Sequence, residues 1–251
     1  MQEIDKQIHD LILNNESYMD ILYRDDRWEV LYNLSPLREN LLEWYPFDNR
    51  ASLLEYGGEY GALTCLFARK VSSVVTLCDN DLQSESVKHR CKELSNVQVV
   101  KSIEEIEQRF DYITIINPKA DIYETIDSMM KFLKDDGKII IACDNSLALK
   151  YFFDDKVAVD AVCMSKNEIT KCLQALGFEH IEFYYPSPDF RLPNTIYSEN
   201  YLPHEGDIRN VNQCFDSEKY HVLNEDYIYD AACNENLYEN IANSFLIFAS
   251  R

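Results

Sequence analysis

The stretch Leu53-Leu54-Glu55-Tyr56-Gly57-Gly58-Glu59-Tyr60-Gly61 decides the fold. The chain has only six glycines, and three of them fall within these nine residues. A short apolar run, 51–54, leads into the stretch, and residues 62–68 after it suit a helix. Glycine adopts the left-handed backbone conformations that a tight turn requires. The sequence therefore predicts a strand, a tight turn and a helix.

The same alternation continues downstream. Further strands are predicted at 74–78, 97–100, 110–116 and 138–143, with helices at 82–94 and 122–133 and a turn at 134–137. Strands separated by helices of this length are typical of parallel βαβ units with right-handed crossovers. We therefore expect an α/β fold with a mostly parallel central sheet and helices on both faces.

The two ends of the chain differ from this regular core. Residues 1–46 are predicted to form a helical cap that packs over one end of the sheet. After the core come a helix at 166–176 and a strand at 181–185, then an irregular, aromatic-rich insertion at 186–240 and a last strand, 243–249, at the sheet edge. We thus expect one compact domain divided into a cap (1–46), a Rossmann-like core (47–185) and a C-terminal part (186–251).

Composition excludes several classes of protein. The chain of 251 residues carries 24 Lys and Arg against 44 Asp and Glu, a formal charge of −20, which disfavours nucleic-acid binding. Its hydrophobic content of 46% suffices for a large core. With no apolar run near the roughly 18 residues of a membrane helix and no leader-like N-terminus, the sequence predicts a cytoplasmic protein without membrane insertion.

Neither cysteine nor histidine spacing indicates a metal. The cysteines never form C-x-x-C, and most lie in apolar runs, so we expect reduced, mostly buried thiols. The histidines show no metal-ligand spacing, and we predict no metal site. The cysteines are Cys65, Cys78, Cys91, Cys143, Cys163, Cys172, Cys214 and Cys233, and the histidines His9, His89, His180, His204 and His221.

The glycine turn and one following acid indicate a ligand. Asp79 stands 22 residues after Gly57, at the end of the second predicted strand. A carboxylate there can accept hydrogen bonds from ribose hydroxyls, so the pattern predicts an adenosine-containing ligand. The alternative is a plain tight turn in which Asp79 caps the next helix. An NAD-dependent oxidoreductase would need a G-x-G-x-x-G turn, which is absent.

The turn resembles the E-x-G-x-G-x-G motif of class I S-adenosylmethionine-dependent methyltransferases. Two further stretches, 110–114 and 133–141, resemble that family's fourth strand and the entry to its fifth. The resemblance covers roughly 35–185 and implies a Rossmann-like fold with S-adenosylmethionine as cofactor. It assigns the cofactor-binding positions to Glu55, Gly57, Gly58, Gly61, Asp79 and Asn117.

Three stretches resemble a narrower group, the methyltransferase-like proteins encoded beside or fused to glycosyltransferases in bacterial cell-surface polysaccharide clusters. They are 34–46, 144–152 and 183–193. This resemblance implies a methyltransferase acting on a sugar, glycolipid or small metabolite linked to surface polysaccharide synthesis. The alternative that we keep is a non-catalytic module of this fold that binds a glycosyltransferase or a related protein.

Two positions depart from the family pattern. Glu59 occupies the place of the cofactor-facing middle glycine, and like charges about 4 Å apart repel by roughly 4 kcal/mol at an effective dielectric near 20. Glu59 must therefore turn outward, pair with the ammonium of the ligand, or weaken cofactor binding. After the third strand the acid that contacts adenine in many relatives is missing, with Glu104 or Glu105 as a substitute.

Methyl transfer needs alignment more than catalytic residues, although a general base assists an oxygen nucleophile. Asp144, after the fifth strand, is our candidate base; the alternative is a capping carboxylate. The candidate acceptor-binding residues are Arg38, Asn145, Tyr185, Arg191 and His204. Their structural alternatives are ion pairing for the arginines, anchoring of the insertion for the aromatic residues, and a surface position for His204.

Overall fold

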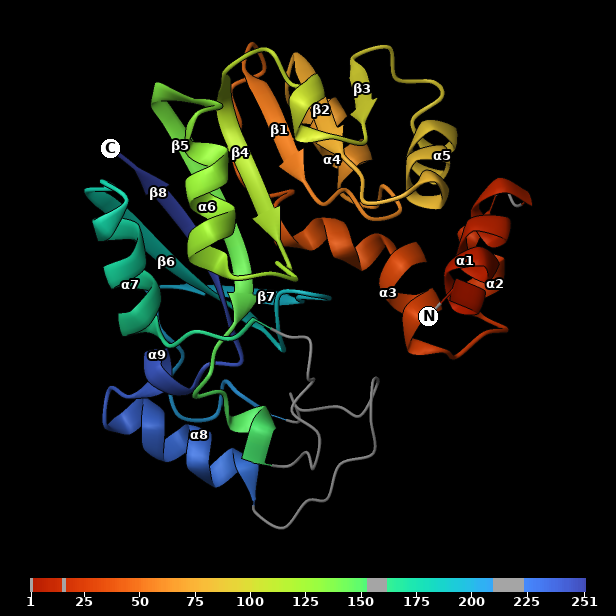
Figure 1. Ribbon diagram of the computed structural model, residues 1–251. Coiled ribbons are helices and arrows are strands. Elements are labelled where there is room, and N and C mark those ends of the chain that lie inside the picture. The colour runs from red at the N-terminus through yellow and green to blue at the C-terminus, as the bar shows by residue number, and fades with distance from the viewer. Residues whose placement is uncertain (1, 15–16, 153–161, 210–223) are drawn as a thin grey trace. The chain divides into compact units, whose positions relative to one another are not determined.

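The structure is a computed structural model that describes residues 2–14, 17–152, 162–209 and 224–251 (Figure 1). The described strands form an eight-stranded, mostly parallel sheet in the order β3-β2-β1-β4-β5-β8-β6-β7. The chain divides into two compact units, Met1–Ile115 with Lys131–Ile139, and Ile116–Met130 with Ile140–Arg251. Cys214 and His221 lie outside the described residues.

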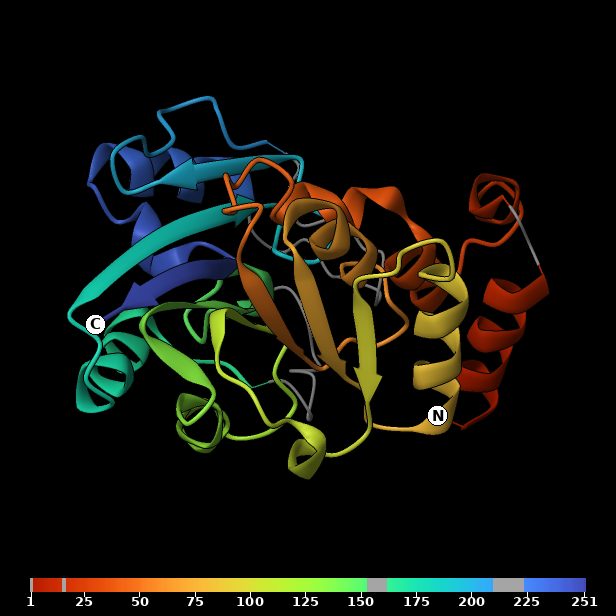
Figure 2. The same ribbon diagram turned by 90° about the horizontal axis from the view of Figure 1, so that it is seen from above.

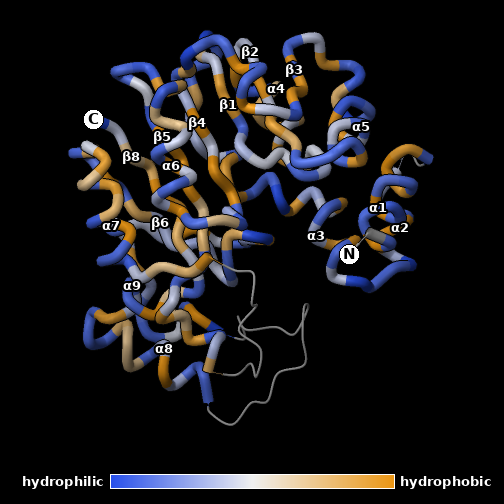
Figure 3. Tube along the Cα trace, viewed as in Figure 1, coloured by the Kyte–Doolittle hydropathy of each residue, from blue (hydrophilic) through white to orange (hydrophobic). Residues whose placement is uncertain are grey.

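The first unit contains the predicted parallel strands. They are β1 (Ser52–Tyr56), β2 (Ser73–Leu77), β3 (Val97–Val100) and β4 (Phe110–Ile116), with β1 pairing in parallel with both β2 and β4. The helices α4 (Thr64–Lys70) and α5 (Asp81–Arg90) pack against β2 and β3. Hydrophobic residues run along β1 and β4 (Figure 3), and the middle of β1 is buried. The α/β prediction is confirmed for these elements.

The N-terminal segment is helical, as predicted. It forms α1 (Gln2–Asn14), α2 (Tyr18–Leu22), α3 (Trp28–Leu34) and a short 3-10 helix, η1 (Pro36–Leu41). Figures 1 and 2 show α1 alongside α5, and Ile8 and Ile12 pack with Val30, Leu34 and Tyr60 of the glycine turn. The cap therefore packs against α5 and the turn, where we had expected it over one end of the sheet.

The fifth strand is longer than predicted. β5 runs from Leu133 to Asp144, so the turn expected at 134–137 is wrong. Two interactions hold this segment against the start of β4: the Phe110 N–H donates to the Phe132 carbonyl over 2.7 Å, and the Lys134 ammonium contacts the Asp111 carboxylate at 2.8 Å. Pairing with a neighbouring strand thus overrides the local turn signal. Helix α6 (Ile122–Met130) precedes it.

The second unit ends in antiparallel strands. It contains η3 (Leu149–Phe152), α7 (Lys166–Ala175), β6 (His180–Ser187), β7 (Thr195–Ser198), α8 (Glu225–Asn234), α9 (Tyr238–Ile241) and β8 (Ser244–Ser250). The last strand, predicted at the sheet edge, instead lies between β5 and β6, and β7 forms that edge. β8 is an unbroken buried run, and a strand buried on both faces belongs inside a sheet.

No helix among the described residues is both long enough and apolar enough to span a bilayer. In the same residues no group of three or more His, Cys, Asp or Glu side chains is arranged to hold a metal ion.

Candidate functional site

The glycine turn is anchored on the neighbouring strand. Gly57 and Gly58 both donate their N–H groups to the Leu77 carbonyl of β2 at 3.1 Å. Gly57 has φ +75°, and a Cβ added at Gly58 would lie 2.0 Å from the Thr76 hydroxyl oxygen. A side chain at Gly58 would therefore push the turn away from β2. The paired glycines bring the backbone against the end of the parallel sheet, where ligands of such folds bind.

Glu55 is a buried acid at the end of β1. Its strand register places it between Thr76 of β2 and Thr114 of β4, and its carboxyl accepts a hydrogen bond from the Thr64 hydroxyl at 2.5 Å. Burial raises the pKa of Glu55 to about 7, against the opposing effect of the hydrogen bond from Thr64. The carboxyl thus changes its charge near neutral pH. Thr64 and Thr76 were missed by the sequence analysis, because their positions beside Glu55 follow from the packing of α4 and from the register of β1 with β2.

Glu59 is paired within the chain. It has φ +44°, and its carboxylate lies 3.4 Å from an Arg38 guanidinium nitrogen and accepts a 3.4 Å hydrogen bond from the Tyr32 hydroxyl. The Arg38 guanidinium lies 3.8 Å from the centre of the Tyr32 ring. Both charged side chains are largely buried, with 6% and 15% of their surface exposed for Arg38 and Glu59. The negative charge that we expected to oppose a cofactor is therefore balanced by Arg38.

Asp79 is exposed beyond the end of β2, as the ribose hypothesis requires. Its own N–H donates to the Gln83 side chain at 3.1 Å. The helix cap is Asn80, whose side chain accepts from the Gln83 N–H at 3.0 Å, so the alternative in which Asp79 caps α5 is wrong. Within the described part of the chain, the Asp79 carboxylate accepts no hydrogen bond.

The two proposed substitutes for the adenine contact have local partners. Glu105 accepts from the Lys101 N–H at 2.9 Å, and Glu104 accepts from the Ser102 hydroxyl. These bonds hold the short 3-10 helix η2 (Ile103–Glu105) after β3. Both carboxylates thus already support this turn.

In the second unit, Asp144 belongs to a charge cluster. Its carboxylate lies 2.5 Å from the Lys150 ammonium and 2.6 Å from an Arg191 nitrogen, and Asp189 contacts the same two cations at 3.4 and 3.0 Å. Burial alone would raise the pKa of Asp144, but the two cations outweigh it and hold the pKa well below its usual range. A carboxylate with so low a pKa is a weak base. Lys150 was missed as a partner.

The other predicted residues of this unit hold the structure together. The Asn145 amide donates to the carbonyls of Asn240 and Ala242 at 2.8 Å, and the fully buried Tyr185 donates its hydroxyl to Glu239 at 2.6 Å. Asn117 has φ +59°, and its N–H donates to the Ala142 carbonyl. His204 is exposed and lines a pocket of about 530 Å³ with Tyr201. The contacts of Tyr185 and Arg191 are the anchoring and the ion pairing that their structural alternatives describe.

The strand order, the antiparallel strands that follow the parallel ones and the glycine turn define the Rossmann-like fold of class I S-adenosylmethionine-dependent methyltransferases. No family model and no curated protein matches the chain in sequence.

Solved structures match the chain in fold. The phosphoethanolamine N-methyltransferase 1 of Haemonchus contortus, solved with phosphoethanolamine and S-adenosylhomocysteine, has a TM-score of 0.53 at 12% identity. The match covers 98% of this chain and 48% of that one, so this chain spans about half its length. A SAM-dependent methyltransferase from Archaeoglobus fulgidus scores 0.54 at 15% identity over 88% of this chain and 94% of its own. One from Thermotoga maritima scores 0.54 at 12% identity, covering 92% and 95%. At these identities the similarity shows the fold alone.

Proposed function

We propose that the first unit binds S-adenosylmethionine at the glycine turn and that the protein is a methyltransferase. The observation that carries the proposal is Asp79, an exposed carboxylate beyond the end of β2, next to a turn whose backbone is anchored on the same strand. A carboxylate in that place suits the two hydroxyls of a ribose. The solved structures of the same fold include one holding S-adenosylhomocysteine, which supports this cofactor.

The residues present fit such a ligand. Gly57 leaves open space where a side chain would stand, since nothing lies within 4 Å of an added Cβ. The Glu59 carboxylate is neutralised by Arg38 and hydrogen-bonded by Tyr32. Glu55 gains a proton near neutral pH, so the buried end of β1 adds little negative charge. We therefore interpret Glu59, which stands where the family has a glycine, as a residue whose negative charge is compensated by Arg38.

When bound, S-adenosylmethionine supplies a methyl group on a sulfonium, which a nucleophile displaces in line. The contribution of this chain is to hold the cofactor, through Asp79 and the backbone of the glycine turn, and to keep its orientation fixed. Asp144 has two cationic partners and a low pKa, so we assign it the task of ordering Lys150 and Arg191 instead of accepting a proton. We propose catalysis by alignment, without a strong general base.

For the acceptor we propose a sugar, glycolipid or small metabolite connected with surface polysaccharide synthesis. The support is the resemblance of stretches 34–46, 144–152 and 183–193 to proteins of such clusters. Two of these stretches meet in one place, because the cluster of Asp144, Lys150, Asp189 and Arg191 is built from both. The first stretch supplies Arg38, the partner of Glu59.

The test is a calorimetric titration of the purified protein with S-adenosylmethionine and S-adenosylhomocysteine. We expect micromolar dissociation constants for both. Asp79→Ala should weaken binding by about 1–3 kcal/mol, through loss of a charged hydrogen-bond acceptor. Glu93→Ala, which removes an exposed carboxylate elsewhere in the same unit, is the matched control and should bind like the wild type.

Two results would contradict the proposal. Equal affinities of Asp79→Ala and wild type would rule out the ribose assignment. Absence of heat with either ligand at high protein concentration would rule out the cofactor, and would favour the non-catalytic module that binds a protein partner. If binding is confirmed, transfer of labelled methyl groups to nucleotide sugars and glycolipids is the assay for the acceptor.

A further inference from the structure

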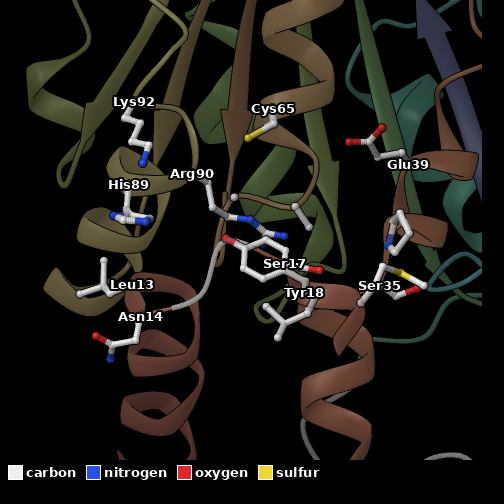
Figure 4. A pocket seen from close by; sticks show the side chains of 15 residues that line it. Leu13, Asn14, Ser17, Tyr18, Ser35, Glu39, Cys65, His89, Arg90 and Lys92 are labelled. Carbon is white, nitrogen blue, oxygen red and sulfur yellow. The ribbon is translucent and has the colours of Figure 1, made fainter. Parts of the chain in front are cut away.

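A pocket of the first unit lies beside the N-terminal helices. It has a volume of about 860 Å³ and is lined by residues of α1, α2, α4 and α5 (Figure 4). Cys65, Arg90 and Tyr18 are among its lining residues. Of the residues that we assign to the cofactor, Gly61 lines the pocket, whereas Gly57 and Asp79 do not. The pocket therefore borders the glycine turn at Gly61 and does not include the ribose acid Asp79.

A pair of thiols adjoins this pocket. Cys65 lies in the first turn of α4 and is half-buried, while Cys91 directly follows α5 and is buried among Cys78 and Val87. Their sulfur atoms are 3.1 Å apart, close enough for one thiol to donate a hydrogen bond to the other. A disulfide bond is about 2.05 Å long, so a shift of about 1 Å would join them.

The surroundings make the two thiols unequal. The hydrogen bond from Cys91, with the nearby Arg90 and Arg69 cations, lowers the pKa of Cys65, whereas the same bond and burial raise the pKa of Cys91. Burial raises the pKa of the neighbouring Cys78 to about 12, so this thiol lacks the lowered pKa of Cys65. A thiolate is the reactive form of cysteine, and nearby cations favour it.

Arg90 is held in place to act on Cys65. One of its guanidinium nitrogens donates to the carbonyls of Asn33 and Tyr60 at 2.9 and 3.0 Å, and the group lies 4.9 Å from the Tyr18 ring centre. No carboxylate in the described part of the chain pairs with Arg90, so its positive charge is not cancelled at the thiols. Figure 4 shows Cys65, Arg90 and Tyr18 on the same pocket.

We propose that Cys65 and Cys91 form a peroxide-reactive dithiol site, in which Cys65 is the attacking thiol and Cys91 the resolving thiol. The Cys65 thiolate attacks one oxygen of a hydroperoxide, the O–O bond breaks, and an alcohol or water leaves after taking a proton. Cys65 is thereby oxidised to a sulfenic acid. The Cys91 sulfur then attacks that sulfur, the S–O bond breaks, and the hydroxide leaves as water with the Cys91 proton. Two equivalents of a small thiol reduce the disulfide and become oxidised themselves.

The pocket and the short distance explain why this pair should react before the other cysteines. The pocket admits a small hydroperoxide to Cys65, and Cys91 needs no access of its own because it already touches its target. The disulfide would join the start of α4 to the end of α5, next to the arginine that holds the Tyr60 carbonyl of the glycine turn. The site does not depend on the proposed methyl transfer.

The experiment treats the reduced full-length protein with one equivalent of hydrogen peroxide, blocks the remaining thiols, and maps peptides by mass spectrometry without reduction. We expect the Cys65–Cys91 peptide pair to be the main disulfide, with Cys65 reacting at least about tenfold faster than Cys172, and dithiothreitol to reverse it. Cys91→Ser should leave a sulfenic acid at Cys65 that dimedone traps. In Cys65→Ser, Cys91 should stay unmodified.

Cys172→Ser is the matched control, because Cys172 is a buried thiol of the second unit whose pKa is raised by burial. It should form the same disulfide as the wild type. Far-ultraviolet circular dichroism establishes that each variant is folded. Oxidation spread evenly over the cysteines, or a main disulfide between other residues, would overturn the proposal.

Discussion

At the residue scale, Arg38 and Glu59 form an ion pair that the sequence alone does not reveal. Both lie in stretches that we singled out, but they stand 21 residues apart, and only the fold brings them to 3.4 Å. By contrast, Glu55 and Asp79 were identified correctly as acids at the ends of their strands, because their positions follow from short-range pattern. Local sequence spacing predicts the position of a residue in its strand, whereas the tertiary structure determines which side chain it contacts.

The Arg38–Glu59 pair should be measurable as a coupling energy. Removing one partner leaves the other charge largely buried and uncompensated, so we expect Arg38→Met and Glu59→Gln each to lower the free energy of unfolding by about 1–3 kcal/mol. The double variant should cost clearly less than the sum. Urea unfolding of the four proteins gives the cycle, and strictly additive losses would contradict the pairing.

Glu55 should make stability depend on pH. Its pKa is raised from 4.5 to about 7 in the folded state, so the folded protein keeps a proton that the unfolded chain has lost. The contribution of Glu55 to the free energy of unfolding is fully present below pH 4.5. It falls as the pH rises toward 7, by about 3 kcal/mol in all.

The test compares Glu55→Gln with the wild type by urea unfolding between pH 4.5 and pH 8. The difference between the two proteins isolates Glu55, since all other titrating groups are common to both. We expect the wild type to lose more stability than the variant across this range. Parallel stability profiles would show that Glu55 ionises normally.

At the scale of elements, the charge cluster joins the end of β5 to η3 and to the segment after β6. Asp144 ends β5, Lys150 lies in η3, and Asp189 and Arg191 follow β6. Asp144→Asn removes the carboxylate charge that lies closest to Lys150 and Arg191, and we expect it to lower the free energy of unfolding by about 3 kcal/mol. Asp135→Asn, which breaks an exposed ion pair with Arg109, should change stability little.

This variant also separates structure from catalysis. A general base would lose turnover in Asp144→Asn while the protein stayed as stable as the wild type. Our assignment instead predicts that Asp144→Asn lowers the stability measured in urea. The folded variant should still bind S-adenosylmethionine. A variant as stable as the wild type would contradict the structural role.

The strands that we predicted correctly, β1 to β4, share a short apolar run bounded by clear stop signals. The helix α7 is instead delimited by its Ser165–Glu168 capping box and by Gly177. The errors concern β5 and β8, where strand pairing decided the outcome. β7, α8 and α9 lie in a stretch that we predicted to be irregular. They were missed because the many polar and aromatic residues of this stretch show no single hydrophobic period.

At the scale of the whole molecule, the excess of acidic residues is the dominant feature. The chain has a formal charge of −20, which comes from 44 acidic against 24 basic residues. Several of the basic residues are engaged in ion pairs, among them Arg38, Lys150, Lys166 and Arg191. Much of the remaining charge is therefore uncompensated acid at the surface, and self-repulsion of like charges destabilises a compact chain.

Salt should therefore stabilise this protein. Raising the ionic strength from 0.01 to 0.15 M shortens the screening length from about 30 to about 8 Å, which weakens repulsion between distant surface acids more than attraction within close, partly buried pairs. We expect the urea midpoint to rise with sodium chloride over this range at pH 7. At pH 4.5, near the isoelectric point, the same salt should have much less effect, because the net charge is close to zero. An equal salt effect at both pH values would show that the salt acts through something other than screening of net charge.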